Sequence, residues 1–366
     1  MMRSSRVRRT AVALVAPALL LAACGSSSKP STDTGTTTAS GSSGGSSSVS
    51  ATLNGSGSTF QQAFDQAAIQ AFQSANSKIT VNYAGGGSGK GKTDLQSKTV
   101  DFAGTDSLVK TADLPKYEGG KILYFPTVAA PITVSYNVSG VDKLQLSPST
   151  LAKIFTGSVK KWNDASIAAD NSGVTLPDTD ITIVHRADAS GTTNNFTHFL
   201  VLAGGSDWTL GTGDTVTWPS SSQAGQGNGG VAQDVSKTDG AIGYVDFADA
   251  LAAKLKFASI KNSAGTFEAP TLAGASAAVG SATIAADLTY SPLNEAGADA
   301  YPITSPTWII VYANQTDHAK GTALKDFLGY ILNDGQGLAE AANYAKLPTS
   351  LQQKAITQLT QLVVPA

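Results

Sequence analysis

The sequence predicts an α/β protein of two lobes with a ligand cleft between them. Three observations lead to this prediction. Apolar strands alternate with amphipathic helices, glycine- and serine-rich turns follow several of the strands, and two proline-containing apolar segments far apart in the chain look alike. Alternating strands and helices favour a largely parallel sheet, in which ligands bind beyond the carboxyl ends of the strands.

The N-terminus predicts export and lipid attachment. Four arginines precede an apolar run over residues 11–21, which ends in Leu21-Ala22-Ala23-Cys24. This pattern is typical of a signal peptide over residues 1–23 with a lipobox, whose Cys24 becomes the lipid-bearing first residue of the mature protein. The apolar run is too short to be a transmembrane anchor. The pair Arg8-Arg9 leaves the twin-arginine export route open beside the general secretory route.

Residues 24–50 are almost all serine, threonine and glycine, which predicts a flexible tether that keeps the folded part near the membrane. Cys24 is the only cysteine, so no disulfide is expected, and three scattered histidines argue against a zinc site. Removing four arginines from the 25 Lys and Arg leaves 21 against 27 Asp and Glu, a charge of about −6. This balance does not favour nucleic acid as a partner. The net negative charge would not attract an anionic ligand, so local dipoles and individual hydrogen-bond donors would have to bind it.

The first part of the folded region shows a repeated pattern of strand, glycine-rich turn and helix. The aromatic and alanine residues of the first helix share one face, which we expect to be buried. The expected elements are, in order, a strand and turn over 53–60, a helix over 60–72, a strand over 78–83, a glycine turn over 84–89, a short helix over 93–98 and a strand over 100–103 that ends in Gly104-Thr105-Asp106.

The two similar apolar segments cover residues 125–137 and 301–314. Each begins with an aromatic residue and a proline, contains a second proline and continues into a β-branched run. Such segments suit crossovers between lobes. In that case residues 51–130 plus 301–366 form lobe I and residues 131–300 form lobe II. The same features also fit two unrelated buried strands, and the sequence leaves both interpretations open.

The stretch from Ile181 to Leu202 carries the strongest sign of a binding site. An alternating apolar strand leads to a helix with a buried face, and Ser190-Gly191-Thr192 stands where the helix begins. The first N–H groups of a helix have no intrahelical partner and lie at its positive end, so they favour an anion. Arg186 offers a planar fork of donors that suits a tetrahedral oxyanion, and Asp188 could hold that fork in place.

The stretch from Gly86 to Thr93, GGSGKGKT, formally matches the phosphate-binding loop of nucleotide triphosphatases. Three observations argue against that function: export away from cytoplasmic ATP, a short following helix, and the lack of an apolar strand ending in a magnesium-binding aspartate apart from the brief segment over 100–106. The glycines could still present backbone N–H groups to an oxyanion.

A serine hydrolase would use Ser190 as nucleophile with His185 and Asp188 nearby. Successive strand residues point to opposite faces, so His185 and Arg186 cannot both face one cleft. The turn also lacks the first glycine of a nucleophile elbow. We therefore expect a protein without catalytic activity.

Asp106 is an acceptor in a site otherwise made of donors. Its carboxylate would repel a fully ionised anion, but it could accept a hydrogen bond from a ligand that keeps a proton. Phosphate keeps one near neutral pH and sulfate does not. Sites that demand a hydrogen bond reject a ligand lacking it by roughly 10⁴–10⁵.

Several motifs, in order from about Leu53 to the C-terminus, resemble the phosphate-binding lipoproteins of phosphate-specific ABC importers. These motifs are GSTF at 57–60, YAGGGS at 83–88, VDFAGTD at 100–106, HRADASGTT at 185–193, GNGGV at 227–231, GAIGY at 240–244 and YP at 301–302. The resemblance implies a two-lobed periplasmic-binding-protein fold of type II and no cofactor. It also implies capture of inorganic phosphate for a membrane permease by a protein anchored through lipid at the outer face of the cell membrane.

The resemblance also implies which residues contact phosphate: Ser58, Thr59, Phe60, Ser88, Asp106, Arg186, Ser190, Gly191 and Thr192. Asp106 would accept the phosphate proton, and Arg186 would be the charged donor, oriented by Asp188. The sequence departs from the usual pattern after Ser88, where Gly89-Lys90-Gly91 replaces serines and glycines. An exported nucleotide binder or phosphohydrolase using Gly86 to Thr93, and a binder of another oxyanion such as sulfate, are the alternatives.

Overall fold

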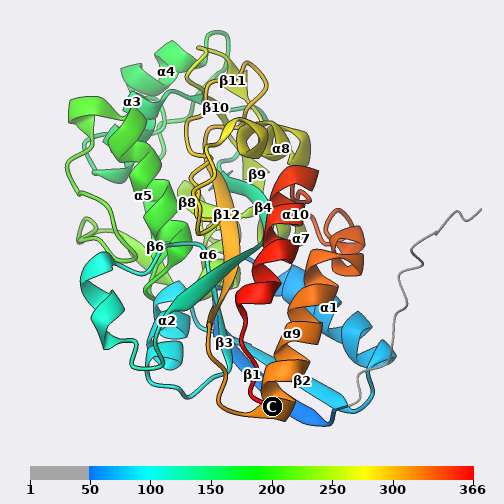
Figure 1. Cartoon of the computed structure of the whole chain (residues 1–366). Coiled ribbons are helices and arrows are strands. Elements are labelled where there is room, and N and C mark those ends of the chain that lie inside the picture. Colours follow the sequence, from blue (N-terminus) through cyan, green and yellow to red (C-terminus); the bar gives the residue numbers. More distant parts are fainter. Residues whose placement is uncertain (1–48) are drawn as a thin grey trace, which may run out of the picture. The chain divides into compact units, whose positions relative to one another are not determined.

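One long sheet runs through the described part of the protein (Figure 1). The computed structural model describes residues 49–366, so the predicted signal peptide, Cys24 and nearly all of the tether lie outside the described residues. The strands of the long sheet are β1 (Ala51–Gly57), β2 (Ile79–Gly85), β3 (Phe102–Thr105), β4 (Ile122–Asn137), β6 (Thr182–Arg186), β7 (Gln223–Gly225), β8 (Ala241–Asp246), β9 (Lys256–Phe257) and β12 (Thr304–Tyr312). Their order is β2-β1-β3-β12-β4-β8-β6-β7, with β9 paired to β4. A small second sheet has the order β11 (Phe267–Glu268), β10 (Ser259–Lys261), β5 (Gln145–Leu146).

Helices cover both faces of the long sheet. They are α1 (Gln62–Ala75), α2 (Ser88–Gln96), α3 (Pro148–Phe155), α4 (Ala165–Asp170), α5 (Gly191–Ala203), α6 (Gly227–Lys237), α7 (Phe247–Ala252), α8 (Leu272–Ser281), α9 (His318–Leu332) and α10 (Thr349–Gln358). Short 3-10 helices cover Thr111–Lys116, Gly205–Asp207, Asp334–Leu338 and Leu359–Gln361. Figure 1 shows α2 and α5 on one side of the central strands, with α1, α9 and α10 on the other. Among residues 49–366, no helix combines the length and the apolar character that crossing a bilayer requires.

Two parallel groups of strands are joined by antiparallel pairs at the centre of the sheet. β1 pairs in parallel with β2 and β3, and β6 pairs in parallel with β7 and β8. Between these groups, β12 pairs antiparallel with β3 and β4, and β4 pairs antiparallel with β8. The expectation of a largely parallel sheet therefore holds within each group and is wrong at the centre, because the two joining segments run in opposite directions.

β4 passes from one group of strands to the other. Its first part, Ile122 to Pro131, pairs with β12, and its second part, Ile132 to Asn137, pairs with β8. All of its residues except the last are buried. β12 runs beside the first part of β4, and the backbone N–H of Ile132 also donates to Ile303 O at 2.7 Å. The pairing partner thus changes where the predicted lobes meet, although the lobe boundaries themselves stay a prediction.

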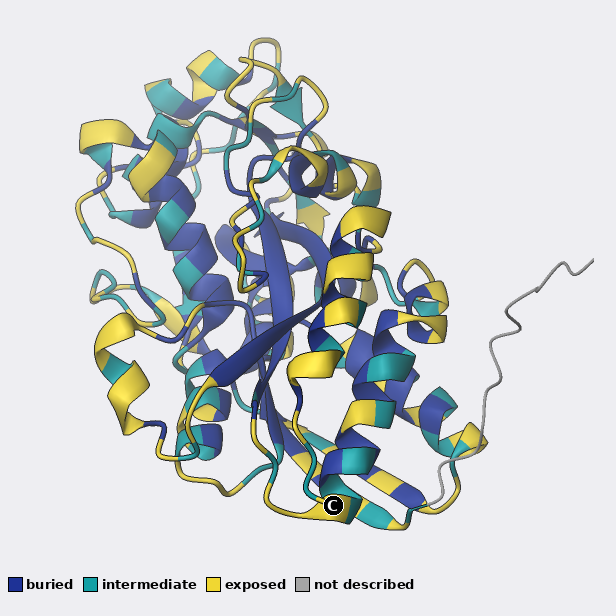
Figure 2. Ribbon diagram, in the orientation of Figure 1, coloured by how far each residue is buried: buried dark blue, intermediate teal, exposed yellow. Residues whose placement is uncertain are grey.

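The core lies along these central strands. Figure 2 shows β4 and β12 as buried, with exposed residues on the outer sides of the helices. On α1, Phe64, Ala68 and Phe72 are buried as expected, but Asp65, which the helical pattern places opposite, is buried too. The expectation that all the alanines of this helix are buried is wrong, because Ala63 is exposed and Ala67 and Ala71 are only partly buried. The C-terminal segment packs on the buried face, where Tyr344 contacts Phe64 with ring centroids 6.2 Å apart.

Helix α2 begins earlier than expected. The sequence predicted a helix over 93–98 after a glycine turn, whereas the helix starts at Ser88 and the turn ends at Gly87, which has a φ of +90°. Gly91 lies on this helix against β1, where an added Cβ would come within 2.7 Å of Gly57 Cα. Close packing of helix on strand, rather than loop formation, thus accounts for this glycine.

Candidate functional site

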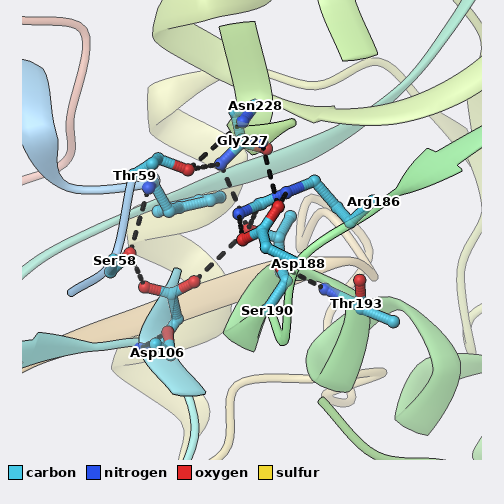
Figure 3. Close-up of polar contacts among 12 residues, drawn as sticks. Ser58, Thr59, Asp106, Arg186, Asp188, Ser190, Thr193, Gly227 and Asn228 are labelled. Atoms are coloured by element: carbon cyan, nitrogen blue, oxygen red, sulfur yellow. Dashed lines mark hydrogen bonds and ion pairs between the residues drawn. The ribbon is translucent and has the colours of Figure 1, made fainter. Parts of the chain in front are cut away.

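The predicted site residues converge where β1, β3 and β6 end (Figure 3). Ser58 directly follows β1, Asp106 directly follows β3, and Arg186 is the last residue of β6. The first residues of α5, which begins shortly after Arg186 in the chain, reach the same point. β1 and β3 are parallel and end at one edge of their group, whereas β6 belongs to the second parallel group, which runs in the opposite direction. The carboxyl ends of the two groups therefore approach each other from opposite sides, and this is how segments so far apart in the chain meet.

Asp106 lies at the centre of this cluster and is 2% exposed. Its carboxylate accepts from Ser58 Oγ on one oxygen and from Thr192 Oγ1, at 3.3 Å, on the other. Its backbone N–H donates to Ser88 Oγ at 3.1 Å. Burial raises the pKa of Asp106 to about 6, although the hydrogen bonds from Ser58 and Thr192 and the charge of Arg186 act in the opposite direction. This carboxyl group therefore changes its protonation close to neutral pH.

Arg186 is the charged donor of the cluster, and it is the only arginine in the sequence after Arg9. Its side chain is 1% exposed. Nε donates to Asp188 Oδ1 at 2.9 Å and Nη2 donates to Asp188 Oδ2, so Asp188 holds the guanidinium plane from one side. Nη1 donates to Thr192 Oγ1 at 3.2 Å. Such a two-point pair fixes the orientation of the fork as well as its position.

His185, the neighbour of Arg186, does not join the cluster. Its ring stacks on Trp218 with centroids 5.3 Å apart, and Nδ1 lies 2.9 Å from the Arg186 carbonyl oxygen. Burial lowers the pKa of His185. The alternation of side chains along a strand thus separates the two residues as expected. Ser190 consequently has no histidine base beside it.

The beginning of α5 is packed tightly against the Asp106 side of the cluster. Ser190 is the N-cap: its Oγ accepts from Thr193 N at 3.2 Å. Gly191 leaves room for the approach, because a Cβ there would lie 2.5 Å from Ser88 Oγ and 2.8 Å from Asp106 Oδ2. This position accordingly requires glycine for space.

The turn after β1 places Thr59 and Phe60 against the same cluster. The Phe60 N–H donates to Ser58 Oγ at 3.0 Å, and its buried ring contacts Tyr344 with centroids 6.4 Å apart. Thr59 Oγ1 accepts from the backbone N–H of Asn228 at 3.2 Å and from its Nδ2 at 3.1 Å. All nine predicted ligand residues and Asp188 therefore lie in one contiguous polar cluster. Their contact with phosphate itself stays a prediction.

Asn228 is a member of the cluster that sequence reasoning did not assign. It is fully buried. Its Nδ2 donates to Thr59 Oγ1 and, at 3.2 Å, to Thr192 Oγ1, while Oδ1 accepts from Asp246 N at 3.2 Å. The sequence showed only a glycine-rich motif here. A polar residue at the start of a helix that follows a strand was the signal that could have found it.

Lys90 and Lys92, from the phosphate-loop-like stretch, both have carboxylate partners. Lys90 Nζ lies 2.5 Å from Asp94 Oδ2 on the same helix, and Lys92 Nζ lies 2.6 Å from Asp214 Oδ2. The stretch from Ser88 onward is helical, so its N–H groups point along α2 instead of lining a loop. The geometry thus differs from a nucleotide-binding loop. Within residues 49–366, no three His, Cys, Asp or Glu side chains gather as a metal site would require.

The comparisons with known proteins fit this geometry. The family described as the PBP superfamily domain matches residues 34–335. Phosphate-binding protein PstS 3 of Mycobacterium leprae (strain TN) is 34% identical over 357 residues, which cover 95% of this chain and 96% of the relative. The chain belongs to the PstS family of phosphate-binding proteins. Another PstS relative, Phosphate-binding protein PstS of Xylella fastidiosa (strain Temecula1 / ATCC 700964), is 36% identical over 277 residues, covering 74% of this chain and 75% of the relative.

Solved structures confirm the two-lobed periplasmic-binding-protein fold predicted for this PstS-family chain. A high affinity periplasmic phosphate-binding protein, solved with phosphate bound at pH 8.5, superposes with a TM-score of 0.70 at 26% identity and covers 84% of this chain and 94% of its own. A phosphate-binding protein from Stenotrophomonas maltophilia gives a TM-score of 0.67 at 20% identity, covering 84% and 94%, which supports the fold alone.

Proposed function

We propose that this PstS-family protein captures inorganic phosphate outside the cytoplasm and delivers it to the membrane permease of an ABC importer. The observation that supports this most is the convergence of one buried arginine, Arg186, and one buried carboxyl group, Asp106, at the carboxyl ends of β6 and β3. Hydroxyl groups and helix-terminal N–H groups surround both. These groups suit the binding of an ion, and the histidine nearest to Ser190 in the sequence, His185, stacks on Trp218 instead of contacting it. We therefore propose a binding protein rather than an enzyme.

The proposed ligand contacts suit a dehydrated oxyanion. Stripping water from phosphate is unfavourable unless nearly every oxygen meets a donor. Arg186, the hydroxyls of Ser58, Ser88 and Thr192, and the first N–H groups of α5 supply such donors. Each hydrogen bond to a charged group contributes about 1.5–3 kcal/mol net, while micromolar binding needs only about 8 kcal/mol in total. Most of the free energy gained from the hydrogen bonds to phosphate is therefore offset by the cost of removing water from the ion and of closing the lobes.

Asp106 gives the proposed site its selectivity for phosphate over sulfate. Its pKa of about 6 means that it is mostly a carboxylate at pH 7 and above, where it can accept the proton that phosphate retains. Sulfate offers no proton, so one of its oxygens would face the carboxylate. A binder of sulfate, the alternative oxyanion, would not be expected to bury an acceptor at this position.

The proposed lobes are residues 51–130 plus 301–366 and residues 131–300. β4 joins them where its partner changes from β12 to β8, next to the Ile132 to Ile303 hydrogen bond. Rotation at these two neighbouring segments would open and close the cleft around the cluster. The permease would then distinguish the closed, phosphate-bound form from the open form.

We further propose that lipid on Cys24 and the tether over 24–50 hold the protein at the outer face of the cell membrane. The lipobox and the composition of the tether support this proposal. Metabolic labelling with a fatty-acid analogue tests it, with Cys24→Ala as the matched control. Label on the wild type alone is expected, and equal labelling of both proteins would contradict the anchor.

Calorimetric titration of the purified protein, stripped of carried-over ligand, tests the proposed binding function. At pH 8 we expect one equivalent of phosphate to bind at micromolar or tighter affinity without magnesium, and no heat from sulfate. Binding only of a nucleotide, and only with magnesium, would instead favour the alternative based on Gly86 to Thr93.

A further inference from the structure

A charged contact joins the two proposed lobes beside the candidate site. Lys92 on α2 belongs to residues 51–130, and Asp214, in the loop between α5 and β7, belongs to residues 131–300. Lys92 Nζ lies 2.6 Å from Asp214 Oδ2, and the two side chains are only 13% and 15% exposed. Neither residue belongs to the predicted phosphate contacts.

Lys92 and Asp214 each make further hydrogen bonds. Lys92 Nζ also donates to Ser107 Oγ at 2.9 Å and to the Leu108 carbonyl oxygen at 3.2 Å. Asp214 Oδ1 accepts from Ser107 Oγ at 2.8 Å and from Asn194 Nδ2 at 3.1 Å. The carboxylate is thus shared between donors of both proposed lobes, which a chance surface pair would not achieve.

The contact is continuous with the cluster that is proposed to bind phosphate. Ser107 directly follows Asp106, and the Asp214 carbonyl oxygen accepts from the Ser190 N–H at 2.9 Å at the start of α5. We propose that Lys92 and Asp214 form a latch that holds the lobes closed and slows the release of phosphate. The effect on phosphate rests on the proposed function. Lys92 and Asp214 act as positioning residues, because they touch each other and the flanks of the site rather than the ligand.

The ion pair between Lys90 and Asp94 is an ordinary pair within one helix and serves as a comparison. Asp94 is four residues away from Lys90 on α2, and the Lys90 side chain is 53% exposed. Exposed pairs of this kind contribute little. The Lys92 pair differs because opening the cleft would separate two largely buried charges, so it favours the closed form specifically. The apparent affinity of a ligand rises with the fraction of protein in its binding-competent form.

Phosphate association and dissociation rates of Lys92→Met, with Lys90→Met as the matched control, test the latch. We expect phosphate to dissociate about tenfold faster from Lys92→Met, with association changed less than about twofold, and no change for Lys90→Met. Asp214→Asn keeps an acceptor for Ser107 and should release phosphate as fast as Lys92→Met. The double variant should release it little faster than either single variant. Equal dissociation rates for Lys92→Met and Lys90→Met would overturn the latch.

Amide hydrogen exchange at Gly89, measured without phosphate, tests the latch independently of the proposed function. The Gly89 N–H donates to the Ala189 carbonyl oxygen at 2.9 Å, across the two proposed lobes, so its exchange reports opening. We expect faster exchange in Lys92→Met than in Lys90→Met at unchanged thermal stability. If the wild type binds no phosphate yet this difference appears, the latch stands and the proposed function fails. The absence of the difference would overturn the latch whatever the ligand.

Discussion

Replacing Asp106 by asparagine should open the site to sulfate. The two side chains have the same shape, so the amide oxygen can still accept from Ser58, while the amide nitrogen adds a donor and the negative charge disappears. Phosphate should lose less than about tenfold in affinity, because an acceptor for its proton is retained. Sulfate, which the carboxylate of the wild type repels, should bind the variant with higher affinity.

The size of the sulfate effect follows from the pKa of about 6 for the buried Asp106. To bind sulfate, the wild-type carboxyl group must take up a proton. At pH 8 this costs about 2.7 kcal/mol, or roughly a hundredfold in affinity, because each pH unit above the pKa contributes about 1.36 kcal/mol. Near pH 6 the penalty is only about twofold. The variant avoids the penalty at every pH.

The assay is a sulfate titration of wild type and Asp106→Asn between pH 6 and pH 8. Wild-type affinity for sulfate should fall about tenfold per pH unit across most of this range, whereas the variant should show little dependence on pH. A wild type without this dependence, together with unchanged sulfate affinity in the variant, would refute the selectivity role of Asp106.

Three further predictions concern other buried polar groups. Arg186→Ala should weaken phosphate binding by about 2–5 kcal/mol, since it also leaves the buried Asp188 without its partner; titration calorimetry checks this, and near-wild-type affinity would place Arg186 outside the site. Asn228→Ala should weaken binding by about 1–3 kcal/mol through unsatisfied hydroxyls, whereas the exposed Asn82→Ala should change nothing, and equal behaviour of the two would contradict the role of Asn228. Burial raises the pKa of Asp65 to about 7, so the folded protein retains a proton that the unfolded chain gives up and stability falls as pH rises from about 4 to 7. In urea unfolding between pH 5 and pH 8, the wild type should therefore lose about 2.5 kcal/mol more than Asp65→Asn, and parallel curves would refute this.

The strand ends were predictable from the sequence because local pattern and chemistry coincide there. Arg186 ends an alternating apolar strand, Ser190 caps a helix whose apolar face is regular, and Asp106 follows a short buried strand. Within each parallel group the strands end at the same edge, and the two groups run in opposite directions, so their carboxyl ends meet at the site. The fold class and the clustering of the predicted site residues follow from these features.

Other features depend on packing that the sequence does not display. Gly89 and Gly91 have poor helix propensity, so the sequence favoured a loop, but close packing of α2 against β1 stabilises a helix there. Asn228 stands in a glycine-rich stretch without periodicity, and only tertiary contacts reveal its role. The helical pattern places Asp65 opposite the apolar residues of α1, but tertiary packing buries it, which is rare for a carboxyl group, and Gln61 Nε2 donates to its carboxylate at 2.9 Å.

A crystal structure of the protein with phosphate would show whether the cluster around Asp106 and Arg186 holds the ion. We expect one phosphate enclosed where β1, β3 and β6 end, with an oxygen in hydrogen-bond contact with the Asp106 carboxyl group and others in contact with Arg186 and the first N–H groups of α5. Phosphate bound elsewhere, or at this place without contact to Asp106 and Arg186, would contradict this expectation.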